Sequence, residues 1–98
     1  MASSKEYLHY VLEQLSEVEG LRYRPMMGEY LIYCCGKVVG GVYDDRLLVK
    51  ATPSAMALLP DAPREEPYPG GKPMLLVTEM ENKRFLRELL EGIADEVK

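Results

Sequence analysis

The sequence has little of what a membrane span or a secreted protein needs. It contains only two cysteines among 98 residues, and its longest apolar runs are a few residues long. Such runs are far shorter than the roughly 20 apolar residues of a transmembrane helix. The first ten residues also have no apolar core of the kind that a secretory signal peptide carries. These absences predict a soluble protein located in the cytoplasm.

Catalytic and metal-binding side chains are equally scarce. His9, the only histidine, falls on the polar side of a predicted helix, where we expect it to be solvated. Cys34 and Cys35 are adjacent, which disfavours a bond between them, and with one histidine they cannot supply the four ligands of a zinc site. No Gly-Lys-Ser or Gly-Lys-Thr follows a strand to form a phosphate loop. We therefore expect no enzymatic activity, metal or cofactor, and two structural free thiols.

Charge and length narrow the possible functions and the number of domains. The chain has 12 Lys and Arg against 16 Asp and Glu residues, which gives a net charge of −4 and a pI near 5.0. Proteins that grip nucleic acid unaided usually present a basic surface, because phosphate contacts dominate the affinity. The acidic balance therefore disfavours direct nucleic-acid binding. The length fits one domain, residues 1–98, with a core that needs no metal or disulfide.

Apolar periodicity predicts an amphipathic helix at each end of the chain. Ser3 and Glu6 have the spacing of a capping box at the start of the first helix, and Gly20 marks its end. Its apolar stripe consists of Tyr7, Leu8, Val11, Leu12 and Leu15. The stripe of the second helix is longer and consists of Phe85, Leu86, Leu89, Leu90, Ile93, Ala94 and Val97.

The middle of the chain predicts an antiparallel meander. Strands are expected at 21–26, 30–34, 37–43 and 46–50, with a two-residue hairpin turn at Cys35-Gly36 and a second tight turn at Asp44-Asp45. Counting from these turns predicts three cross-strand pairs: Tyr33 with Val38, Leu31 with Gly40, and Val42 with Leu47.

Alternation of side chains then assigns two faces to this sheet. The expected core face is wholly apolar and comprises Leu31, Tyr33, Val38, Val42, Leu47 and Val49. The other face is half polar, within a basic rim of Lys37, Arg46 and Lys50, and comprises Tyr30, Ile32, Val39, Tyr43 and Leu48. This composition is typical of an interface, so the second face is a candidate surface for a partner or a dimer. The alternative is that a proline-rich loop or a short helix covers it.

The remaining segment joins the meander to the last helix. Residues 53–59 predict a short helix with proline near its start. Residues 60–73 hold five of the seven prolines and predict a loop, followed by a strand at 74–78. Two amphipathic helices and one apolar sheet face predict a two-layer α+β fold, in which an antiparallel β-meander packs on the N- and C-terminal helices.

Several short motifs follow one another in a characteristic order. Residues 24–28 read Arg-Pro-Met-Met-Gly, Tyr33 and residues 36–40 follow, and residues 44–50 read Asp-Asp-Arg-Leu-Leu-Val-Lys. Together they resemble the N-terminal domain of the TfoX/Sxy family, with its Arg-x-Met-Phe-Gly stretch and Arg-Leu-Tyr-Leu-Lys strand. Met27, Cys35 and Leu48 depart from that pattern. The positions that match it are Arg24, Met26, Gly28, Gly36 and Lys50, and the two glycines are expected to serve the backbone.

The resemblance covers nearly the whole chain and implies a role. Competence regulators of the family carry a second, C-terminal helical domain, so the expectation here is a stand-alone N-terminal domain. The named members are similar to bacterial transcriptional co-activators of DNA-uptake genes, which work with a cyclic-AMP receptor protein and are not enzymes. The resemblance therefore implies a regulatory domain that binds another protein, such as a transcription factor, or a second copy of itself.

Two other functions stay open. A small-molecule sensor or an enzyme of unrecognised type would use a pocket between the proline-rich loop and the sheet, with Tyr68, Arg24 and Lys50 as polar groups. Direct nucleic-acid binding would use Arg22, Arg24, Arg46 and Lys50. A structure without a concave cavity at that place would remove the first, and a lack of DNA binding at low salt would remove the second.

Overall fold

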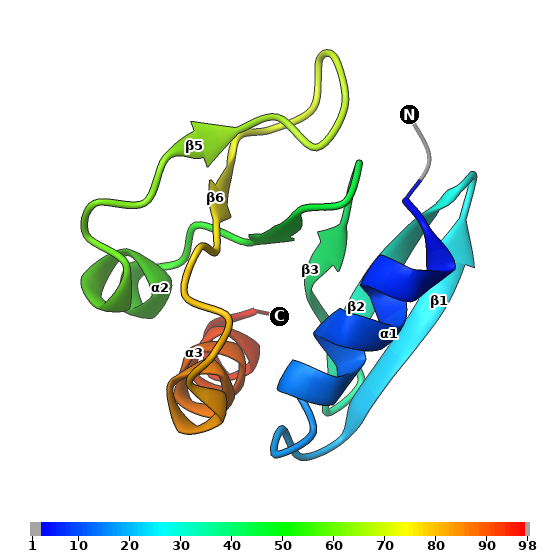
Figure 1. Cartoon of the computed structure of the whole chain (residues 1–98). Helices are drawn as coiled ribbons and strands as arrows, with labels where there is room; N and C mark the ends of the chain where they lie inside the picture. The colour runs from blue at the N-terminus through cyan, green and yellow to red at the C-terminus, as the bar shows by residue number, and fades with distance from the viewer. Residues whose placement is uncertain (1–2, 98) are drawn as a thin grey trace.

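Three helices and six strands make up residues 3–97, the part of the chain that this computed structural model describes (Figure 1). In chain order they are α1 (Lys5–Gln14), β1 (Leu21–Met26), β2 (Glu29–Cys34), β3 (Lys37–Val42), β4 (Leu47–Val49), α2 (Pro53–Leu58), β5 (Arg64–Glu65), β6 (Met74–Leu76) and α3 (Lys83–Glu96). Within residues 3–97, every helix is too short or too polar to span a bilayer.

The strands form one antiparallel sheet in the order β1-β2-β3-β4-β6-β5. Side chains from α1, α2 and α3 share one hydrophobic core with side chains from the strands. Figure 1 shows α1 alongside β1 and β2, and α3 next to α2. We call the helix-covered side of the sheet the inner face and the opposite side the outer face. The fold is the predicted two-layer α+β domain.

The first helix forms where expected, but its cap is different. The Ser4 hydroxyl accepts a hydrogen bond from the Tyr7 N–H at 3.1 Å, so Ser4 is the N-cap. The predicted capping box of Ser3 and Glu6 is wrong. Ser3 instead donates from its backbone N–H and its hydroxyl to the Glu29 carboxylate, at 3.1 and 2.8 Å. The buried tertiary contact with β2 takes precedence over the local pattern.

The other helices begin at side chains that accept backbone hydrogen bonds. The Asn82 side chain accepts from the Phe85 N–H at 3.0 Å and starts α3, and Thr52 caps α2 in the same way. The predicted stripe of α3 is confirmed in the core, with five buried residues: Leu86, Leu89, Leu90, Ile93 and Ala94.

Tight turns join the first four strands. Positive φ values occur at both central residues of Met27-Gly28, Cys35-Gly36 and Asp44-Asp45, as type I′ hairpin turns require. The predicted turns at Cys35-Gly36 and Asp44-Asp45 are therefore confirmed. Gly36, with φ +81°, supplies the left-handed conformation without a steric cost.

A β-bulge in β3 changes the predicted register. Tyr33 pairs with Val38 as expected, but Ile32 pairs with Gly40, so Val39 is an extra residue without a partner opposite it. Leu31 consequently lies opposite Gly41, and its predicted pairing with Gly40 is wrong. The pair of Val42 with Leu47 is confirmed.

The bulge also corrects the assignment of the faces. Because it inserts one residue, the alternation reverses between the two halves of β3. Val39 and Ile32 are fully buried in the core with Val42, Leu47 and Val49. Three of the residues predicted for the core face lie instead on the outer face, where they are only partly buried: Leu31, Tyr33 and Val38.

The proline-rich segment is less irregular than predicted. Within residues 60–73, β5 pairs with β6 through Arg64 with Leu75 and Glu65 with Met74. A strand of two residues has no periodicity that a sequence could display, so only the pairing reveals it. The predicted short helix and the strand beginning at Met74 are both present as α2 and β6.

Candidate functional site on the outer face of the sheet

The residues predicted to form an interaction face do not share one accessible surface. Ile32 and Val39 are 0% exposed on the inner face, because the bulge turns them toward the helices. Leu48 is also 0% exposed and Tyr43 is 7% exposed, although both lie on the outer side. Tyr30 is partly buried and packs against the core. The predicted face is therefore wrong as a docking surface.

The predicted basic rim is also engaged in internal contacts. Lys37 donates from its ammonium to the Ala94 carbonyl in the last turn of α3, at 3.0 Å. Arg46 forms an ion pair with Glu65 and donates from Nε to the Tyr43 carbonyl at 3.1 Å. These two cations tie the sheet to α3 and β5, which leaves Lys50 as the rim residue without such a contact in the described chain.

The family-typical residues are distributed over the molecule. Gly28 and Gly36 occupy turns at opposite ends of the β1-β2-β3 meander, with φ values of +86° and +81°. Met26 is exposed at the end of β1. Only Arg24 and Lys50 belong to the outer face, and they line two different hollows there.

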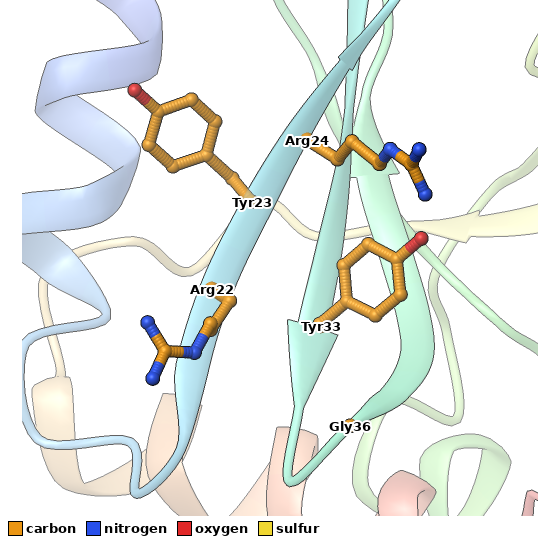
Figure 2. Close-up of a pocket in the computed structure, with 5 residues that line it drawn as sticks. All are labelled: Arg22, Tyr23, Arg24, Tyr33 and Gly36. Atoms are coloured by element: carbon orange, nitrogen blue, oxygen red, sulfur yellow. The ribbon is translucent and has the colours of Figure 1, made fainter.

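The first hollow lies over β1 and β2 and has a volume of about 300 Å³. Arg22 and Arg24 are two residues apart on the edge strand β1, and Arg22 pairs with Tyr33 on the neighbouring strand β2. Figure 2 shows Arg24 and the Tyr33 ring extending toward the same side, while Arg22 points away from them. Neither guanidinium has a hydrogen bond or ion pair within residues 3–97. The hollow is therefore lined by two arginines without internal partners, and Arg24 lies on the same side as the Tyr33 ring.

The second hollow lies between the outer face and residues 67–73, where the sequence suggested a pocket, and has a volume of about 680 Å³. Lys50 and Tyr68 line it as anticipated, but Arg24 does not. The loop adds a second cation, Lys72, and no Asp or Glu lines the hollow. Its other lining residues are Val38, Gly40, Tyr43, Ala51, Pro67, Gly70, Gly71, Pro73 and Met74.

The loop beside this hollow has a defined shape. The Gly71 N–H donates to the Tyr68 carbonyl at 2.9 Å across Pro69 and Gly70. Gly70 has φ +87°, so the four residues form a type II turn with proline and glycine at its two central positions. A Cβ on Gly71 would lie 3.0 Å from the Tyr68 ring, which shows how closely that ring packs on the turn. Tyr68 is nevertheless 56% exposed.

Tyr43 forms part of the same hollow as a neutral phenol. Its burial raises the pKa of the hydroxyl, and the nearby Tyr68 and Glu29 raise it further. The Tyr43 hydroxyl therefore keeps its proton at neutral pH. The ring lies over Gly41, where a Cβ would come within 2.6 Å of it.

Charge is separated along the outer face. Another hollow, of about 500 Å³, lies at the turn end of the sheet, and four of its lining residues are acidic: Glu29, Asp44, Glu65 and Glu66. The cations Arg22, Arg24, Lys50 and Lys72 line the other two hollows, in which no carboxylate takes part. Although the net charge of the chain is −4, part of its outer face is therefore basic, and composition alone does not reveal this.

The cysteines occupy the opposite end of β2. Cys34 is buried and Cys35 is exposed, and both thiols donate to the Glu19 carbonyl, at 3.4 and 3.7 Å. Burial and the neighbouring Cys35 raise the pKa of Cys34 to about 12. A thiol with so high a pKa stays protonated and is a poor nucleophile at neutral pH. His9 is exposed on α1 and lines neither of the first two hollows.

The architecture defines a class: an antiparallel six-stranded sheet with three helices on one face and a basic, partly aromatic surface on the other. The chain belongs to the family of the TfoX N-terminal domain, which matches residues 13–86 and thus every strand. It is also 35% identical over 72 residues to an uncharacterized 12.7 kDa protein in the trpE 5′ region of Spirochaeta aurantia. That match covers 74% of this chain and 63% of the relative. No solved structure matches the chain.

Proposed function

We propose that this chain is a non-enzymatic regulatory domain that acts in the cytoplasm by docking an acidic surface of another protein onto the outer face of β1 and β2. The observation that carries this proposal is that two unpaired arginines of β1, Arg22 and Arg24, line the first hollow together with Tyr33. Arginine and tyrosine are enriched among the residues that dominate binding energy at interfaces. A partner carboxylate would meet guanidinium groups that make no competing contact within the described chain.

Membership of the TfoX N-terminal domain family supports a regulatory role for such docking. Because named members of this family resemble competence co-activators, the proposed partner is a transcription factor. The sequence also suggested a dimer, which the same surface would support only through acidic residues of a second copy.

Direct nucleic-acid binding has less support. Of its four candidate cations, Arg46 is held by Glu65 and is not free to contact phosphate. Three remaining cations on a chain of net charge −4 offer few of the phosphate contacts that dominate such affinity. The acidic hollow at the turn end of the same face would repel a continuing nucleic-acid backbone.

The test is quantitative partner capture from the native cell with three forms of the chain. The reversal variant is Arg22→Glu with Arg24→Glu, and the matched control is Lys5→Glu with Arg84→Glu, which changes the same charge on exposed helix positions. We expect a protein with an acidic surface to be retained by the wild type and the control and lost with the reversal variant. Equal retention by the reversal variant, or salt-sensitive retention on DNA instead, would contradict the proposal.

A further inference from the structure

The second hollow has features of a ligand site that protein docking at β1 and β2 does not use. Its volume of about 680 Å³ lies in the range of small-molecule sites, which is roughly 300–1,000 Å³. It is a concave space between two different elements, the sheet and residues 67–73. None of its lining residues belongs to the first hollow, so the two sites can be tested separately.

The charge of this hollow selects for an anion. Lys50, directly after β4, and Lys72, in the loop, line it, and no carboxylate lines it to neutralise them. Neither ammonium group has a hydrogen bond or ion pair among residues 3–97. Two unneutralised ammonium groups at one concave site attract a negatively charged group and offer it charge-assisted hydrogen bonds.

The shape of the hollow selects for a flat ring. Gly40 contributes backbone without a side chain, and the ring of Tyr43 lies against the sheet over Gly41. The Tyr68 ring lines the same hollow from residues 67–73 and is 56% exposed, although Gly71 and its own turn pack against it. A planar group in the hollow would bury exposed surface of the Tyr68 ring and stack against it. Apolar atoms of Val38, Ala51 and Met74 complete the lining.

We propose that this hollow binds a small organic anion, in which a planar aromatic ring stacks on Tyr68 and a carboxylate or phosphate group pairs with Lys50 and Lys72. The inference goes beyond protein docking and adds a ligand site to the same outer face. Tyr43 donates a hydrogen bond from its neutral hydroxyl to the polar edge of the ligand.

The experiment is a titration of the full 98-residue chain, followed by amide chemical shifts, with 1-naphthoate as the probe. We expect saturable shifts at Gly40, Lys50, Tyr68 and residues 70–72. The variant Lys50→Gln with Lys72→Gln removes both ammonium groups and should weaken binding by about tenfold or more, since each lost charged hydrogen bond is substantial. The control Lys5→Gln with Arg84→Gln makes the same charge change on the helices and should bind like the wild type.

Further measurements separate the parts of the proposal. Lys50→Arg with Lys72→Arg keeps both charges and should retain binding, which distinguishes lost charge from lost folding. Naphthalene-1-methanol, which has the ring without the charge, and inorganic phosphate, which has charge without a ring, should each bind at least about tenfold more weakly than 1-naphthoate. The proposal is overturned by non-saturating shifts up to about 10 mM 1-naphthoate, by equal binding of either partial probe, or by unchanged binding to the double glutamine variant.

Discussion

The two faces of the sheet serve different purposes, although their residues alternate along the same strands. On the inner face, Ile32, Val39 and Val49 are 0% exposed and pack against three helices. On the outer face, Tyr33 and Val38 are only partly buried, and the cations beside them have no internal partner among residues 3–97. Most of the buried core therefore lies on the inner face, whereas the outer face carries the cations that are available for binding.

This separation has a practical consequence for mutagenesis. The Arg24 side chain is exposed and Lys50 is half-buried, and neither side chain has a hydrogen bond or ion pair among residues 3–97, so replacing them should change binding with little effect on folding. Surface substitutions of this kind usually alter the free energy of unfolding by less than about 0.5 kcal/mol. Inner-face substitutions should lower stability and leave binding unchanged. Three pairs of residues compare a tightly packed position with a less tightly packed one.

The largest effect is expected at Ile32. Ile32→Ala removes a fully buried side chain and leaves a cavity among the helices, which should lower the free energy of unfolding by about 2–5 kcal/mol. Leu31→Ala, one residue away on the outer face, should cost about 1 kcal/mol. Urea unfolding monitored by circular dichroism measures both values. A larger loss at Leu31 than at Ile32 would show that the bulge is absent and that the register counted from the turns is right.

A smaller effect is expected at Gly40, where β3 approaches β4. A Cβ there would lie 2.3 Å from the Leu48 carbonyl oxygen and 2.9 Å from the Val49 Cα, so backbone would have to move. Gly40→Ala should therefore cost about 1–3 kcal/mol. Gly36→Ala meets open space and loses only the ease of a positive φ, which costs about 1 kcal/mol. Thermal melts of the two variants give the comparison, and equal stability of Gly40→Ala and the wild type would refute the close approach.

The smallest effect concerns the two thiols. Because folding raises the pKa of Cys34 to about 12, its stabilising contribution is complete below the pKa of about 8.5 in the unfolded chain. It is lost progressively as the pH rises from there toward 12. Urea unfolding at pH 7.5 and at pH 10.5 should therefore show a decline that Cys34→Ala removes and that Cys35→Ala reduces less, because burial is the larger cause of the raised pKa.

Thiol reactivity provides a control for this pH dependence. At pH 8, a thiol reagent should modify exposed Cys35 in the folded protein and reach buried Cys34 only after denaturation. Rapid modification of both thiols in the folded protein would mean that Cys34 is not enclosed by the core.

Local signals predicted the elements well. The stripe of α3, the short helix at Pro53 and the turns at Cys35-Gly36 and Asp44-Asp45 are all present. Each depends on neighbours in the chain, through helical periodicity or through the backbone conformation that a turn demands. The family resemblance, read from motifs between residues 24 and 50, is confirmed by the match over residues 13–86.

Long-range features were predicted less well. The bulge at Val39 reversed the faces, although Gly40-Gly41 inside a strand is a known signal of such an irregularity. Ser3 turned from the helix cap to the Glu29 carboxylate, which is 26 residues away in sequence. Neither outcome can be read from local spacing, because both depend on which strand lies beside which.

In the candidate site, too, the sequence predicted the residue types but not their long-range contacts. The sequence singled out Arg22, Arg24, Lys50 and Tyr68 as polar groups, but it could not say which of them are free. Arg46 has the same residue type and a similar place in the predicted sheet, but its ion pair with Glu65 excludes it from the free cations. Lys72 gave no signal of its own, because it becomes part of a site only where its loop lies beside Lys50.

Local sequence is enough to specify the helices, the tight turns, the α+β class and the family, because these depend on periodicity, turn chemistry and the order of short motifs. The buried face, the pairing of the cations and the position of the hollows emerge only when distant segments pack together. The physical reason is that burial and charge pairing are set by contacts between distant segments, and one inserted residue in β3 is enough to exchange the inside of a strand for its outside.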